Sequence, residues 1–304
     1  MIPRGYLFVF ACASSFGLIT SLAKLTYDEG ASPPTVVFFR LLSGSLLMGV
    51  LSAWTHRKKL HPAKIKPKVS NTWTVAVLVG VTGISISVMS LGYLGSVKYI
   101  PVSLSVLLFF TFPFWVLLIN YLIYREVPSR LKLTAFVLAF FGLSLTLGPT
   151  WEVLDWRGIA LVMGGSLGAS GMLIGGAKTV QLISLSDFVF LSNTVGAIIV
   201  GIFLFFTDTF SLSQTMWGWS GIAAICILFV IGQLFLFAGT RRIGTAQTSI
   251  MLNLEPFVSI GAAMVLLGEC LELSQSVGVL VVISALFMAS DAANRFSVAA
   301  KNNL

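Results

Sequence analysis

The sequence predicts an all-α polytopic membrane protein whose ten transmembrane helices form two five-helix repeats of opposite orientation. This prediction depends on an apolar composition, on long unbroken apolar runs and on a pattern that occurs in both halves of the chain. Of the 304 residues, 57% are hydrophobic and 10% are charged, whereas charged residues make up about 25% of a soluble domain. The apolar runs take up most of the length, so no separate soluble domain is expected.

Ten apolar segments follow one another along the chain, and most are close to the ~20 residues that a helix needs to span a bilayer. Because they are continuous, without the alternation of barrel strands, they are expected to be helices. The segments lie at about residues 5–25, 34–54, 73–93, 101–122, 131–148, 158–178, 187–206, 217–237, 246–267 and 274–291.

The distribution of charge predicts that both termini are cytoplasmic. With the N-terminus inside, fifteen of the nineteen Lys and Arg residues fall on the cytoplasmic side, as the positive-inside rule requires. Two termini on one side require an even number of spans, which favours ten. The net charge of +8 is thereby explained by topology, and no nucleic-acid partner is expected.

Two stretches of the chain repeat each other. When Leu107–Glu126 is aligned with Ile250–Glu269, at an offset of 143 in the numbering, Pro113 falls on Pro256 and each stretch ends in a glutamate. Because five helices are an odd number, the second repeat would enter the membrane from the opposite side. Inverted repeats of this kind are common in secondary transporters.

The repeat predicts two domains, residues 1–150 and 151–304. A weaker alignment near an offset of 153 supports this division, since it pairs Arg40 in FFRLLSG with Asn193 in FLSNTVG.

Glu255 is the first candidate site residue, because a carboxylate in an apolar run costs about 2.5–3.5 kcal/mol on insertion scales. Pro256 beside it removes a helical hydrogen-bond donor. Two interpretations stay open for Glu255: it bonds to a broken helix turn, or it contacts a substrate amine or carries a proton. Either one requires polar partners or a cavity.

Other candidates are residues expected to face the interior, most of them polar or aromatic, and each has an alternative structural role. Arg40 would either snorkel to the interface or pair internally, and the serines, like Gly164, Gly168, Gly171 and Gly175, would also suit close helix packing. The predicted substrate-binding set is Glu255, Gln233, Tyr93, Ser85, Met89, Ser170, Ser259, Phe237 and Arg40.

No enzyme motif, metal-ligand spacing or nucleotide-binding run is present in the sequence. The cysteines, Cys12, Cys226 and Cys270, lie in or beside apolar runs and are expected to be small buried hydrophobes. We therefore expect no catalytic residues, no metal and no cofactor.

Three short motifs resemble a known family. FFRLLSG near the start of the second segment, Leu254-Glu255-Pro256-Phe257 in the ninth and Gly268-Glu269 at its end resemble EamA-type transporters of the drug/metabolite transporter (DMT) superfamily. The architecture is like that of YddG-type exporters. The first half departs from the family pattern, with Phe112 in place of the Glu before Pro113 and Arg125 in place of the Gly before Glu126.

The resemblance implies a secondary carrier with a central cavity between helices. It leads us to expect a multi-pass exporter of amino acids or related small metabolites in a bacterial inner membrane, as a monomer or weak dimer, with a proton as the candidate coupling ion. Two alternatives stay open: an importer of a small metabolite from the same superfamily, and a helical membrane protein that transports nothing.

Overall fold

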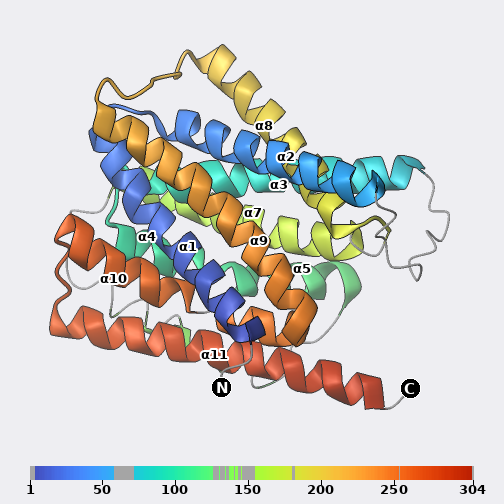
Figure 1. Ribbon diagram of the computed structural model, residues 1–304. Helices are drawn as coiled ribbons and strands as arrows, with labels where there is room; N and C mark the ends of the chain where they lie inside the picture. The colour runs from blue at the N-terminus through green and yellow to red at the C-terminus, as the bar shows by residue number, and fades with distance from the viewer. Residues whose placement is uncertain are drawn as a thin grey trace. The chain divides into compact units, whose positions relative to one another are not determined.

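The computed structural model describes residues 4–57, 72–125, 155–179, 182–252 and 254–302, together with residues 130, 134, 137–139, 141–142 and 145 (Figure 1). Within these ranges every element is a helix, as the sequence predicts. The helices are α1 (Arg4–Asp28), α2 (Pro33–Arg57), α3 (Thr72–Ser96), α4 (Val102–Phe109), α5 (Phe112–Tyr124), α7 (Trp156–Thr179), α8 (Leu185–Thr207), α9 (Met216–Leu252), α10 (Glu255–Leu267) and α11 (Leu273–Asn302).

Six segments in the described part are long and apolar enough to cross a membrane, which makes the chain a multi-pass membrane protein. They are Gly5–Asp28, Pro33–Arg57, Thr72–Ser96, Trp156–Gly176, Leu185–Thr207 and Met216–Leu236. The segments Glu255–Leu267 and Leu273–Ala285 are shorter apolar helices. Of the predicted helix over residues 131–148, the structure describes only residues 134, 137–139, 141–142 and 145.

The structure differs from the predicted helix boundaries in two places. The predicted helix over 101–122 is divided into α4 and α5, because Pro113 near the start of α5 cannot continue a helix from the preceding turn. Helix α9 covers the predicted helix over 217–237 and continues into the one predicted over 246–267 as far as Leu252, and α10 then begins at Glu255, next to Pro256. No proline lies between residues 237 and 246, so no residue of this stretch lacks a backbone donor and α9 continues through it.

Contacts divide the chain into two compact units, and each unit takes segments from both halves of the sequence. The first unit consists of Met1–Ser21, Tyr99–Ile159 and Ile231–Leu304. The second unit consists of Leu22–Lys98 and Ala160–Val230.

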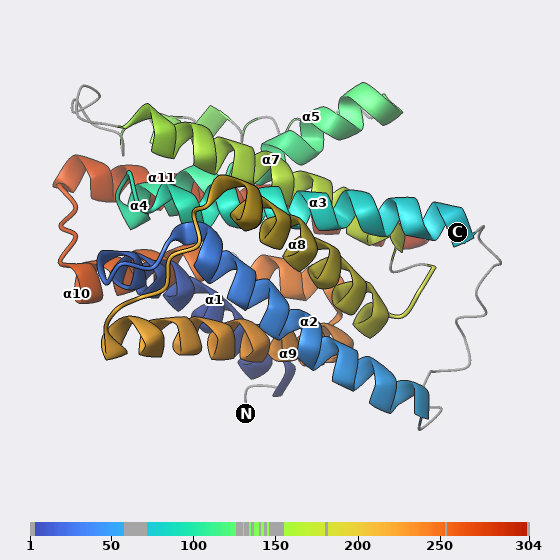
Figure 2. The ribbon, with the colours of Figure 1, turned by 90° about the horizontal axis from the view of Figure 1, so that it is seen from above.

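In the second unit, α8 packs along α2 and α3, and the three helices run side by side (Figure 2). The α2–α8 contact is reciprocal. A Cβ added to Gly44 of α2 would lie 2.8 Å from Nδ2 of Asn193, and one added to Gly196 of α8 would lie 3.3 Å from a methyl group of Leu41. The helices that carry Arg40 and Asn193, which the weaker alignment paired, thus pack on each other through small residues.

Helix α7 approaches α3 closely through its glycines, which confirms the close packing predicted for this segment. A Cβ on Gly168 would lie 2.6 Å from the backbone nitrogen of Met89, and one on Gly165 would lie 2.7 Å from that of Tyr93. A Cβ on Gly164, by contrast, would have no neighbour within 4 Å. Gly164 is therefore not part of the contact, although the sequence pattern included it.

In the first unit, α10 packs on α4, and the loop after α10 caps the start of α4. One carboxylate oxygen of Glu269 accepts a hydrogen bond from the backbone N–H of Val102 at 2.7 Å, and the other accepts from the backbone and the hydroxyl of Ser103 at 3.1 and 2.6 Å. Glu126, the counterpart of Glu269, lies outside the described residues.

Candidate functional site

The predicted site residues fall into two sets, one in each compact unit. Glu255, Gln233, Ser259 and Phe237 belong to the first unit, and Arg40, Ser85, Met89, Tyr93 and Ser170 belong to the second.

The first unit contains two interrupted helices whose breaks occur at equivalent positions. Helix α5 begins after Thr111 and α10 begins after Leu254, which is the repeat offset of 143 in the numbering, and each helix has its proline in the first two positions. In neither helix does the side chain of the N-cap residue accept a hydrogen bond from a backbone N–H of the first turn. In each helix the proline removes one backbone donor from the first turn.

Glu255 lies in the first turn of α10 and is half-buried. A negative charge there is stabilised by the helix dipole. On the side of α1, a Cβ added to Gly17 would lie 3.0 Å from the backbone oxygen of Glu255. The local geometry thus accounts for a carboxylate at this position and leaves a substrate or proton role as a prediction.

Ser259 lies one turn after Glu255 and joins α10 to α1. Its hydroxyl oxygen is 2.5 Å from that of Thr20, and both side chains are buried. The hydrogen bond fixes α10 against α1 beside Glu255. A substrate would have to compete with Thr20 for the Ser259 hydroxyl.

Gln233 is buried on α9, at 8% exposure, as expected for an amide that is costly in contact with lipid. The neighbouring Gly232 faces the ring of Phe16 on α1, since an added Cβ would overlap a carbon of that ring. Phe237 lies on α9, and its side chain is outside the described part of the structure.

In the second unit, α3 presents Ser85, Met89 and Tyr93 along its contact with α7. A Cβ on Gly171 would lie 2.6 Å from Oγ of Ser85, and the backbone of Met89 faces Gly168. Ser170 is fully buried, and its hydroxyl donates to the carbonyl of Ser166 at 3.1 Å. Ser85, Met89 and Tyr93 thus lie at a helix–helix contact, and the glycines of α7 allow the two backbones to approach closely there.

Arg40 points into the second unit and does not snorkel outward. Its side chain is 7% exposed, its Nη2 donates to Oγ of Ser90 at 2.5 Å, and its guanidinium carbon lies 4.8 Å from the ring centre of Phe229. Neither partner could be recognised from the sequence, because Ser90 is one of four serines in α3 and Phe229 is one of 24 phenylalanines.

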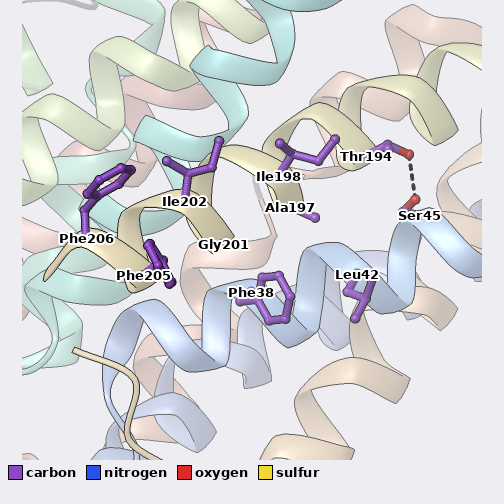
Figure 3. A pocket seen from close by; sticks show the side chains of 10 residues that line it. All are labelled: Phe38, Leu42, Ser45, Thr194, Ala197, Ile198, Gly201, Ile202, Phe205 and Phe206. Carbon is purple, nitrogen blue, oxygen red and sulfur yellow. Dashed lines mark hydrogen bonds between the residues drawn. The ribbon is translucent and has the colours of Figure 1, made fainter. Parts of the chain in front are cut away.

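A groove of about 460 Å³ runs between α2 and α8 (Figure 3). At one end, the hydroxyls of Ser45 and Thr194 bond to each other at 2.7 Å. The other lining residues are apolar, so the groove suits hydrocarbon better than a polar solute. They are Phe38, Leu42, Ala197, Ile198, Gly201, Ile202, Phe205 and Phe206.

Among the described residues, no group of three or more His, Cys, Asp or Glu side chains could hold a metal ion.

Comparison with known proteins gives one family. The model of the EamA-like transporter family matches residues 3–148 and again residues 156–290, so the same family pattern occurs in each half of the chain. No curated protein matches the sequence. One solved structure, described only as the crystal structure of a protein, has a TM-score of 0.58 and 13% identity and covers 96% of this chain and 98% of its own. At that identity the likeness shows the fold alone.

Proposed function

Because the chain belongs to the EamA-like transporter family, within the DMT superfamily, we propose that it is a secondary transporter that exports amino acids or related small metabolites. Transport would proceed by alternating access through a central cavity. The proposal includes ten transmembrane helices, two inverted repeats over residues 1–150 and 151–304, and cytoplasmic termini in a bacterial inner membrane.

The pair of interrupted helices is the observation that carries this proposal. Helices α5 and α10 both begin next to a proline, at positions related by the repeat offset. Transporters built from repeats form their substrate sites from discontinuous helices whose exposed termini bind charged groups. A protein that used its helices only for packing would gain nothing from two equivalent breaks.

In this proposal, the substrate contacts come from residues of the predicted set. Glu255 at the start of α10 would hold a substrate amine or a coupling proton. The absence of enzyme motifs and the transporter family both argue against catalysis.

Flux into reconstituted liposomes tests the proposal. Purified protein is reconstituted and assayed for uptake of each amino acid, with and without a pH gradient, against liposomes without protein. We expect uptake of a limited set of amino acids, and faster uptake with a gradient if a proton is coupled. No protein-dependent flux of any amino acid would contradict the proposed substrate class.

Two alternative functions predict different results. An importer of the same superfamily would show flux of a small metabolite, with a preferred direction in oriented vesicles opposite to that of an exporter. A non-transporting membrane protein would show no flux of amino acids or other metabolites, while remaining folded by thermal unfolding.

A further inference from the structure

The groove in the second unit lies between one face of α2 and one face of α8 (Figure 3). Its deepest part is formed by small residues: Ala197 is buried, and a Cβ added to Gly201 would lie 3.2 Å from the ring of Phe38. At the end formed by Ser45 and Thr194, each hydroxyl already has a partner, because the Thr194 hydroxyl also donates to a backbone carbonyl one turn earlier in α8. The groove therefore offers a ligand apolar contacts rather than hydrogen bonds.

The walls of the groove are open to the surroundings of the helices. Four large residues of α8 form them, and their exposed fractions lie between 52% and 82%. They are Ile198, Ile202, Phe205 and Phe206. Because α2 and α8 are both long and apolar enough to span a membrane, this surface meets lipid hydrocarbon in the bilayer, where no water is present to compete.

The length of the groove matches the hydrocarbon thickness of one lipid leaflet. Its lining extends from Thr194 to Phe206 on α8, which is about 18 Å at the rise of an α-helix, and half of the hydrocarbon core is about 15 Å. Helices that associate in membranes approach each other through small residues, whereas the most exposed lining residues here are the bulky Phe205 and Phe206. A single acyl chain therefore suits the groove better than a helix of a second copy.

The end of the groove opposite the two hydroxyls is acidic. The segments that border it, residues 28–39 and 202–215, contain three acidic residues and no Lys or Arg. The three are Asp28, Glu29 and Asp208. A hydrogen bond of 2.6 Å from the hydroxyl of Thr215 to Oε2 of Glu29 connects the loops after α1 and α8, and Asp208 follows the last lining residue of α8 by two positions. A headgroup at this end thus meets negative charge.

We propose that this groove binds one acyl chain of a phospholipid whose headgroup carries an ammonium group, with the chain between α2 and α8 and the ammonium at Asp208. Phosphatidylethanolamine has such a headgroup. Phosphatidylglycerol is anionic, so the acidic end of the groove repels it. Lipid binding is additional to the proposed transport and does not depend on which solute is carried. A bound chain contacts α2 and α8 together and stabilises their packing.

The unfolding temperature of the full-length protein tests the proposal, with phosphatidylethanolamine as the probe. The purified protein is washed free of lipid in detergent, and the lipid is added at increasing mole fraction in the micelle. Phosphatidylglycerol with the same acyl chains is the comparison. A lipid that binds only the folded protein raises its unfolding temperature, and we expect phosphatidylethanolamine to raise it more than phosphatidylglycerol.

Ile202→Trp tests the position of the acyl chain, because the larger side chain occupies the middle of the groove. We expect this variant to lose at least half of the stabilisation by phosphatidylethanolamine. Ile227→Trp on α9 is the matched control, since Ile227 is 57% exposed, close to the 52% of Ile202, and does not line the groove. It should respond to the lipid like the wild type.

Asp208→Asn tests the position of the headgroup. Asp208 has a left-handed backbone conformation with a φ of 50°, which asparagine also tolerates, so the variant should fold normally. We expect it to lose at least half of the difference between the two lipids. Glu272→Gln, at an exposed acidic residue of the first unit, should keep the full difference.

Equal stabilisation of the wild type by both lipids, or equal responses of Ile202→Trp and Ile227→Trp, would overturn the proposal. If Ile202→Trp does not fold, Ile198→Trp takes its place, because Ile198 lines the groove and is 56% exposed. A second copy of the chain is tested with Ile198→Cys in a background without native cysteines. Disulfide-linked dimers that persist when phosphatidylethanolamine is added would assign the groove to a dimer contact and reject the lipid.

Discussion

Arg125 and Gly268 end equivalent helices with the same left-handed backbone conformation. Their φ and ψ angles are 57° and 24° at the end of α5 and 67° and 20° at the end of α10. The two positions are related by the offset that also relates Pro113 to Pro256. Both ends of the repeated helix therefore have the same local geometry in the two halves, although one half uses glycine and the other uses arginine.

The conformation at Gly268 predicts the effect of replacing this glycine. A residue with a Cβ pays about 1–2 kcal/mol in the left-handed region, and no atom lies within 4 Å of the position that a Cβ would take at Gly268. We expect Gly268→Ala to lower the free energy of unfolding by about 1 kcal/mol through the backbone alone. Denaturant titration in detergent measures this change.

Two further variants control this prediction. Gly261→Ala lies within the same helix and also meets no neighbour within 4 Å, so it should leave stability unchanged or raise it. Arg125→Gly should raise stability by about 0.5 kcal/mol, since relief of backbone strain exceeds the entropy cost of glycine. Equal effects of alanine at positions 261 and 268 would contradict the conformational explanation.

The α3–α7 contact predicts a difference between two glycines of α7. A Cβ at Gly168 would lie 2.6 Å from the backbone of Met89, which cannot move without displacing α3. We expect Gly168→Ala to lower the free energy of unfolding by about 1–3 kcal/mol. Gly164→Ala is the matched control, because its Cβ would meet nothing within 4 Å. The unfolding temperature of Gly168→Ala should be the lower of the two. Similar unfolding temperatures for both variants would contradict a close contact between α7 and α3 at Gly168.

Glu269 predicts a stabilising cap between the loop after α10 and the start of α4. Its carboxylate accepts from two backbone N–H groups and from the Ser103 hydroxyl. We expect Glu269→Gln to cost about 1–2 kcal/mol, because charge-assisted bonds become neutral ones and the favourable charge at the helix start is lost. Ser103→Ala removes a single bond and should cost less. An unfolding temperature unchanged by Glu269→Gln would exclude a stabilising role for the cap.

The charge distribution predicts which positions are accessible from each side of the membrane. In a background without native cysteines, single cysteines at Glu29, Asp208 and Glu272 should react with an impermeant thiol reagent added from outside. Cysteines at Arg241 and Lys301 should react only after the cells are opened. Gel-shift labelling of intact and opened cells measures this pattern, and a mixed pattern would overturn the ten-helix model with cytoplasmic termini.

Sequence alone could predict the helical membrane fold and the repeat, because both depend on long-range patterns of apolar residues and on prolines with strong local effects. The division of the predicted helix over 101–122 was missed, although Pro113 was its signal, because the run stays apolar through the break. The continuity of α9 was missed because Gly239 and the basic pair Arg241-Arg242 resemble a loop in composition.

The neighbours of the polar residues could not be predicted from the sequence. Whether Arg40 pointed inward depended on Ser90 and Phe229, which are distant in the sequence and approach it only through the packing of α2, α3 and α9.

Replacing Glu255 distinguishes a structural role of this carboxylate from a role in binding a substrate amine or a proton. The helix dipole of α10 stabilises the charge of this carboxylate, so a structural role predicts that Glu255→Gln is somewhat less stable but transports normally. A role in binding a substrate amine or a proton requires the charge itself.

Gln keeps the shape and the hydrogen bonding of Glu but cannot ionise. If the charge acts in transport, folded Glu255→Gln should lose most of its flux or lose the dependence of flux on pH, in liposomes assayed across a range of pH values. Unchanged flux with an unchanged pH profile would restrict Glu255 to the stability of α10, and the contact with the substrate amine would then have to come from another group.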